Sequence, residues 1–290
     1  MVFSVNDFDE GAIFDFQLDV LRLAVSISNH GFTNGLTSRE VTEALREFAF
    51  TYIQTTIGYV GGDTELEYEL TEETSVGVLK DFLVEGACTV LGDSTSFWTL
   101  FNLHCRSQCP PQPKVGKIPQ MKMMNKFTEV GSDGVRRFVR DERTRLEDVS
   151  PDMEKKIRAE ITSTKYGATM LKMGWLVHGW DDAFFEVLDV TRRVGSGVGS
   201  YGVHRFYVLL RGNGEPVLLD VKEEPESAVG SLLAELGPEE SAWYDTLFRN
   251  EADRVAKAQR RLTSYTDPYV GYLVRAFLEA RIHPLLVTAV

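Results

Sequence analysis

Cysteine is scarce in this chain of 290 residues, in which only Cys88, Cys105 and Cys109 occur. An odd and low number of cysteines provides no disulfide framework, so we expect a reducing, cytoplasmic location. The first residues lack a basic segment that leads into an apolar one, so we expect no signal peptide there. No apolar run approaches the roughly 18 residues that a membrane span needs, so we expect no membrane partner.

Basic residues are also in the minority. Lys and Arg number 31 against 43 Asp and Glu, which gives a net charge of −12. Because a nucleic-acid backbone is neutralised by clustered Lys and Arg, we expect no nucleic-acid partner. The one local cationic zone, residues 114–145, is expected to be a solvated surface, with an acceptor or polyanion site as the alternative. The 43% apolar and 26% charged composition is that of an ordinary globular protein.

The character of the sequence changes near Asp182. Helical spacing of apolar residues dominates before it, whereas strand-like runs and glycine turns follow it. The expected lobes are a mainly helical one with an acidic loop over residues 1–182 and one with a glycine-rich loop, a β-hairpin and helices over residues 183–290. We therefore predict an α+β fold with a mostly helical lobe and a small antiparallel sheet.

Two helices are expected near the beginning of the chain. Apolar residues recur at helical spacing between 14 and 25, and the polar run 29–35 is expected to end that helix. Thr37 and Glu40 then have the spacing of a capping box, which predicts the start of a second helix.

A glycine-rich segment lies in the last third of the chain. Gly197, Gly199 and Gly202 satisfy the G-x-G-x-x-G pattern. Glycine lets the backbone approach a phosphate closely and turn its N–H groups toward it. Glycines also occur in ordinary turns, so a plain β-hairpin with a flexible tip is the alternative.

The residues around the glycines favour one use of this pattern. Residues 186–194, 203–210 and 217–222 are strand-like, and residues 212–214 predict a turn between the second and third runs. A Rossmann fingerprint needs a helix to begin within the motif, and a Walker A loop needs Gly-Lys-Ser/Thr. Two strands around a glycine loop, followed by a third that ends in Lys222, are typical of the nucleotide-binding hairpin of kinase-like folds. In that hairpin the lysine pairs with the phosphates.

A short acidic loop follows the first apolar run. Asp7 and Asp9 lie close together there, and Mg²⁺ is often held by one or two carboxylates together with substrate phosphates. The alternative is a solvated turn that caps a helix beginning near Ala12, since Asp and Glu suit a helix N-terminus.

These motifs together resemble the bacterial family numbered twenty-two fifty-two among the domains of unknown function, a distant relative of protein kinases and aminoglycoside phosphotransferases. The similarity is strong over about residues 2–30 and 186–275. Segments that match the family's motifs in order are 2–10, 18–26, 196–200, 219–224, 254–260 and 266–271.

The resemblance implies a two-lobed kinase-like fold in permuted order that binds ATP and Mg²⁺. Asp7 would be the main metal ligand and a catalytic residue, with Asp9 assisting, and Lys222 would pair with the phosphates. The loop residues that would lie over the phosphates are Gly195, Gly197, Gly199, Ser200 and Gly202.

Two departures from the family pattern leave the activity open. The family's Gly-Asp-x-His-x-x-Asn segment would precede Met1, so we expect the chain to be truncated at its N-terminus. Lys257 also stands where the family often has Glu, which leaves Glu251 as a substitute partner for a lysine. The expected function is that of an ATP·Mg²⁺-dependent phosphotransferase with an unknown acceptor. The alternative is a catalytically inactive nucleotide-binding or interaction protein.

Overall fold

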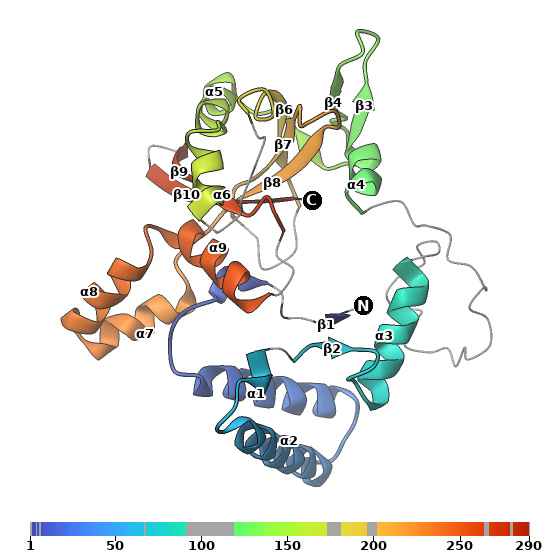
Figure 1. Ribbon diagram of the computed structural model, residues 1–290, viewed down its shortest axis with the longest axis vertical. Helices are drawn as coiled ribbons and strands as arrows, with labels where there is room; N and C mark the ends of the chain where they lie inside the picture. The colour runs from blue at the N-terminus through green and yellow to red at the C-terminus, as the bar shows by residue number, and fades with distance from the viewer. Residues whose placement is uncertain are drawn as a thin grey trace. The chain divides into compact units, whose positions relative to one another are not determined.

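The computed structural model describes residues 2–3, 5, 7–66, 68–90, 119–172, 181–195, 202–263, 267–278 and 281–289. Helices and antiparallel strands make up these parts of the chain, which confirms the predicted α+β class (Figure 1). The chain divides into two compact units, one of residues 1–4 and 13–111 and the other of residues 5–12 and 112–290. The kinase-like lobes and their boundary near residue 182 stay predictions. Among the described residues, no helix combines the length and the apolar character needed to cross a bilayer.

The first unit consists mainly of helices. Its elements are β1 (Val2–Phe3), α1 (Gln17–Thr33), α2 (Ser38–Tyr59), the 3₁₀ turn η2 (Thr64–Leu66), β2 (Leu70–Thr71) and α3 (Gly77–Val90). Strands β1 and β2 pair in antiparallel fashion. The predicted capping box is confirmed at the start of α2, where the Glu40 amide donates to Thr37 Oγ1 at 3.3 Å and the Thr37 amide donates to Glu40 Oε2 at 2.8 Å.

The first helix ends within the predicted run 29–35, since α1 reaches Thr33 and Asn34 is its C-cap. Gly31 is buried inside α1, and a Cβ atom added to it would lie only 2.9 Å from Val41 Cγ2 of α2. This glycine therefore allows the two helices to approach each other and does not end the first one.

The second unit contains an extended sheet with helices around it. Its elements are η1 (Phe8–Glu10), α4 (Pro119–Phe127), β3 (Thr128–Val130), β4 (Arg136–Phe138), β5 (Leu146–Glu147), α5 (Pro151–Glu160), α6 (Tyr166–Lys172), β6 (Val187–Arg193), β7 (Arg205–Leu210), β8 (Val217–Glu223), α7 (Ala228–Leu236), α8 (Pro238–Leu247), α9 (Glu251–Leu262), β9 (Gly271–Leu278) and β10 (Arg281–Ala289).

Six described strands form one antiparallel sheet in the order β5-β6-β7-β8-β10-β9. The three strands predicted between residues 186 and 223 are confirmed as β6, β7 and β8, and Gly212 and Gly214 turn the chain between the last two with φ values of 66° and 90°. Strands β9 and β10 were not predicted. Because β10 pairs with β8, the strand that carries Lys222 lies in the interior of the sheet and not at its edge.

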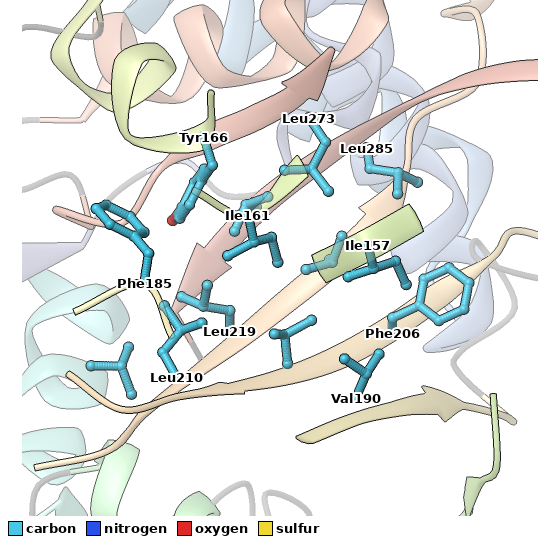
Figure 2. Packing of buried hydrophobic residues seen from close by; sticks show 14 of the residues in the cluster. Ile157, Ile161, Tyr166, Phe185, Val190, Phe206, Leu210, Leu219, Leu273 and Leu285 are labelled. Carbon is cyan, nitrogen blue, oxygen red and sulfur yellow. The ribbon is translucent and has the colours of Figure 1, made fainter. Parts of the chain in front are cut away.

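One face of this sheet carries the main hydrophobic core (Figure 2). Alternate residues of β6, β7, β8 and β10 meet apolar side chains of α5 and α6 there. Ile157 of α5 and Ile161, which directly follows α5, lie over the strands. They cover Leu210, Leu219 and Leu285 (Figure 2). This face is therefore filled by packing and leaves the chemistry to the other one.

The opposite face is divided into apolar and charged parts. Leu218 and Tyr207 belong to an apolar cluster with α4, whereas Leu286 and Tyr272 belong to a second cluster with α9. Asp220 and Lys222 lie between these clusters on the same face of β8, since side chains alternate along a strand. The strip between the clusters carries the candidate site.

We expect Leu219→Ala to lower the free energy of unfolding by about 2–5 kcal/mol, because the site is fully buried and the truncation leaves a cavity. Leu171→Ala is the control, since Leu171 is 55% exposed in the same unit. Urea unfolding followed by circular dichroism measures both variants. Equal losses would contradict the assignment of the core.

Candidate functional site

The acidic loop forms a 3₁₀ turn that packs against α9. Asp7 precedes the turn with a left-handed backbone (φ 62°), and Phe8 contacts the apolar cluster of α9, β9 and β10. The amide of Gly11 closes the turn by donating to the Phe8 carbonyl at 2.8 Å. A Cβ atom at Gly11 would lie 2.9 Å from Ala258 Cβ, so glycine is needed for this close approach. The loop does not cap the next helix, because α1 begins only at Gln17.

A buried arginine holds the backbone of this loop. Arg254 of α9 is 1% exposed, and its Nη2 donates to the Asp9 carbonyl at 2.7 Å while its Nη1 donates to the Gly11 carbonyl. Its Nε donates to Glu251 Oε2 at 2.6 Å, which balances the buried charge. A buried charge is tolerated when it is paired and hydrogen-bonded, and the guanidinium meets both conditions.

The loop has a further connection to the N-terminus of α7. Glu10 Oε2 accepts a hydrogen bond from the Ala228 amide at 2.7 Å, in the first turn of that helix. A carboxylate at a helix N-terminus meets unpaired N–H groups and the positive end of the helix dipole. Two helices that follow β8 in the sequence therefore position the loop.

Lys222 lies between the carboxyl groups of Asp9 and Glu224. Its ammonium contacts Asp9 Oδ2, and it lies 3.5 Å from Glu224 Oε1. The Lys222 side chain is 14% exposed and that of Asp9 is 29% exposed, so water screens this pair only in part. The sequence predicted that Asp7, with Asp9 assisting, shares one site with Lys222. The structure brings Asp9 to Lys222, while Asp7 lies exposed two residues earlier.

Glu224 is a buried carboxyl at the end of β8. It is 1% exposed, and neither of its oxygens has a hydrogen-bond partner within the described part of the structure. Burial raises the pKa of Glu224 to about 8, and the negative charge of Asp9 acts in the same direction, whereas Lys222 and Arg254 oppose the shift. Strongly perturbed groups in charged surroundings are candidates for functional sites.

A second ion pair on the same face of the sheet continues the charged strip. Arg205 of β7 lies opposite Lys222, and its Nε donates to Asp220 Oδ1 at 2.8 Å. This hydrogen bond, which Arg205 donates to the Asp220 carboxylate, raises the pKa of Arg205. Asp220, Lys222 and Glu224 therefore form a row of ionisable side chains along β8 and just beyond its end.

The flanks of the glycine loop lie at the same end of the sheet as Lys222. Gly195 and Gly202 adopt positive φ values of 65° and 86°, and Gly197, Gly199 and Ser200 lie outside the described residues. Beyond the loop, the Glu223 amide donates to the His204 carbonyl at 2.8 Å, and the His204 amide donates to Glu223 Oε2 at 3.0 Å. The connection between β6 and β7 thus ends, at His204, beside the residue that follows Lys222.

Glu251 is not the partner that the sequence suggested for a lysine. It pairs with Arg254, three residues later on α9. Glu224 and Arg254 are the residues whose importance sequence reasoning missed. The period of two along a strand could have placed Glu224 on the face of Lys222, but nothing local distinguishes Arg254 from the exposed arginines of the same helix.

The Asp9 carboxylate of the acidic loop lies next to the ammonium of Lys222. Within the part of the chain that the structure describes, no three side chains of the His, Cys, Asp and Glu types gather as a metal-binding group. Asp7 and Asp9 lie in one turn beside a lysine ammonium, and Mg²⁺ held by one or two carboxylates takes its remaining oxygens from phosphates and water. The metal-ligand and phosphate-binding roles of these residues stay predictions.

Glu224 should make stability depend on pH. Its pKa is about 8 in the folded chain and near 4.5 when unfolded, so the folded state holds the extra proton between these values. The free energy of unfolding should therefore fall as the pH rises through this window, by up to about 1.4 kcal/mol per pH unit.

Glu224→Gln should flatten that slope in urea unfolding between about pH 5 and about pH 8. Glu186→Gln is the control, because its hydrogen bond with Arg211 lowers the pKa of Glu186 below the window. A slope unchanged by Glu224→Gln would contradict the assignment.

Arg254→Gln should cost about 3–5 kcal/mol of unfolding free energy, because Glu251 loses its buried charge partner and the loop carbonyls lose their donors. Arg261→Gln, on the exposed side of the same helix, should have little effect. Thermal unfolding compares the two variants. Similar melting temperatures would show that Arg254 does not hold the loop.

Comparison with known proteins gives one finding. The family model described as "Uncharacterized protein conserved in bacteria (DUF2252)" matches residues 1–87 and 113–280. The matched segments cover most of the chain and include the acidic loop, Lys222, Glu224 and Arg254. The searches of curated proteins and of solved structures found no match.

Proposed function

The chain belongs to this bacterial family, and from that premise we propose that it binds ATP with Mg²⁺ at Lys222 and acts as a kinase-like phosphotransferase. The observation that carries the proposal is the position of Lys222. It lies on an interior strand, at the glycine-loop end of the sheet, and in contact with a carboxylate of the acidic loop.

Each part of the site has a chemical use toward a nucleoside triphosphate. The ammonium of Lys222 would pair with phosphate oxygens, and the backbone N–H groups of residues 195–202 would approach them. Asp9, assisted by Asp7, offers the carboxylate oxygens that Mg²⁺ prefers. Bound Mg²⁺ would supply charge neutralisation at the phosphates. Phosphoryl transfer depends mainly on positioning and charge stabilisation, which a lysine held by a rigid strand provides.

The buried carboxyl group of Glu224 supports the proposed nucleotide site at Lys222. A fully buried carboxyl without a hydrogen-bond donor in the described structure is costly, and proteins retain such groups mainly where they serve a function. Its 3.5 Å separation from the Lys222 ammonium gives the lysine a partner that does not belong to the acidic loop. The contact with Glu224 would therefore hold the Lys222 side chain in place when a phosphate replaces Asp9 as its partner.

A second candidate function is nucleotide binding without phosphoryl transfer. Active protein kinases need an ion pair between the strand lysine and a helix glutamate. Glu251, the helix glutamate considered for that role, pairs with Arg254. This observation favours a kinase-like protein that binds nucleotide and uses the complex to contact a partner.

Lys222→Ala should weaken binding of ATP·Mg²⁺ by about tenfold or more, because it removes the cation that would pair with the phosphates. Lys156→Ala is the matched control, since Lys156 pairs with Asp152 through Nζ and Oδ2 at 2.5 Å on α5. Isothermal titration calorimetry with ATP and excess Mg²⁺ measures both. If the unaltered chain does not bind, or if both variants bind equally well, the proposal is wrong.

A separate measurement distinguishes the two candidate functions. The chain is incubated with ATP·Mg²⁺, and ADP formation by transfer of the γ-phosphoryl group to water is followed over hours. ADP formation that Lys222→Ala abolishes favours the phosphotransferase, whereas tight binding without ADP favours the non-catalytic protein.

A further inference from the structure

The lysine of the site is already occupied by an internal anion. Lys222 contacts Asp9 Oδ2, and both side chains are partly shielded from water. An ion pair with an effective dielectric constant near 20 is several times stronger than the same pair in water. A phosphate that approaches Lys222 therefore competes with the Asp9 carboxylate and is also repelled by it.

Asp9 has little freedom to withdraw from the lysine. Its own carbonyl accepts from Arg254 Nη2 at 2.7 Å, and the Gly11 carbonyl accepts from Nη1 of the same guanidinium. Phe8 packs against the apolar cluster of α9, and Ala258 lies close to Gly11. The backbone of the turn is thus held on both sides of Asp9, so the carboxylate stays within reach of Lys222.

Lys222 is held as well. It is part of β8, which pairs with β7 and β10, and Glu224 lies 3.5 Å from its ammonium. Neither partner of the Lys222–Asp9 pair can move far, so another anion gains access to Lys222 only if the charge of Asp9 is satisfied elsewhere.

We infer that Asp9 is an internal competitor that blocks Lys222 to free polyphosphate anions and admits them only when a divalent cation satisfies its carboxylate. This inference rests on the proposed nucleotide site and adds its regulation. The ligand class it selects is the metal complex of a nucleoside triphosphate and not the free nucleotide. Because coupling between two ligands is reciprocal, the nucleotide must also strengthen binding of the cation.

The test is the affinity for ATP without metal, in EDTA, measured by calorimetry. Asp9→Asn removes the competing charge, and Arg254 still holds the loop because it bonds to main-chain carbonyls. Binding of metal-free ATP should become about 5- to 150-fold tighter, the usual range of a coupling between two sites. Added Mg²⁺ should strengthen binding to the unaltered chain much more than binding to this variant.

Glu10→Gln is the matched control. It removes one negative charge from the same turn, and its amide oxygen can still accept from the Ala228 amide. It should leave the affinity for metal-free ATP nearly unchanged. If Asp9→Asn tightens the binding of metal-free ATP no more than Glu10→Gln does, the inference is overturned.

A second background tests whether the gain acts through Lys222. In a Lys222→Gln chain, Asp9→Asn should not tighten the binding of metal-free ATP, because the ammonium that the substitution would free is missing. A gain of the same size in that background would overturn the inference. Asp9→Ser serves as a second variant if Asp9→Asn does not fold, and its expected results are the same.

The outcomes separate the two proposals. Tight binding of ATP·Mg²⁺ to the unaltered chain, without a gain for Asp9→Asn in EDTA, overturns only the competition by Asp9. No binding by any variant under any condition overturns the proposed nucleotide site, and the inference fails with it. Inorganic triphosphate in place of ATP shows whether Lys222 recognises the phosphates alone.

Discussion

Arg254 donates hydrogen bonds to two carbonyl groups of the acidic loop while it is buried on α9. The two hydrogen bonds join residues that are 243 and 245 positions apart along the chain. Removing a charge from water is costly, and the cost is offset here by Glu251 and by the carbonyl acceptors. The position of Asp9 depends on this arrangement, together with the packing of Phe8 and the hydrogen bond that Glu10 accepts from α7. Every property proposed for the site presupposes that the loop stays against β8.

The sheet separates packing from chemistry through the alternation of its side chains. One face is filled by the core that α5 and α6 cover, and the other is apolar only near α4 and α9. The charged strip between those clusters is therefore flanked by apolar surface, which lowers the local dielectric constant and strengthens its ion pairs. Burial in the same surroundings raises the pKa of Glu224. The strand β8 thus carries part of the core on one side and part of the charged strip on the other.

Competition for Lys222 is the property that connects these features. Asp9 contacts the lysine and Glu224 lies near it, yet the two carboxyl groups are in different environments. Asp9 remains partly in contact with water, whereas Glu224 is enclosed and tends to hold its proton. The lysine is therefore paired with one exchangeable carboxylate and supported by one that cannot leave. Such an arrangement suits a site in which the ammonium of Lys222 exchanges the Asp9 carboxylate for a phosphate.

Local patterns in the sequence predicted the elements that depend only on neighbouring residues. The capping box of Thr37 and Glu40 is formed, and β6, β7 and β8 lie where alternation and the turn at Gly212 indicated them. Such signals are reliable because backbone conformation and side-chain period are properties of short segments. The site residues Asp7, Asp9 and Lys222 could be proposed for the same reason, since carboxylates and lysines at strand ends carry a recognisable chemistry.

Only the tertiary structure decided how these residues act on one another. The contact of Asp9 with Lys222 joins positions 213 apart, and β10 takes its place beside β8 from the far end of the chain. The partner of Glu251, the burial of Glu224 and the hold of Arg254 on the loop depend on the same long-range packing. The amino-acid sequence by itself determined which charges are present and which strand carries Lys222. Folding decided which charges meet and which lose their water, because both depend on neighbours that are distant along the chain.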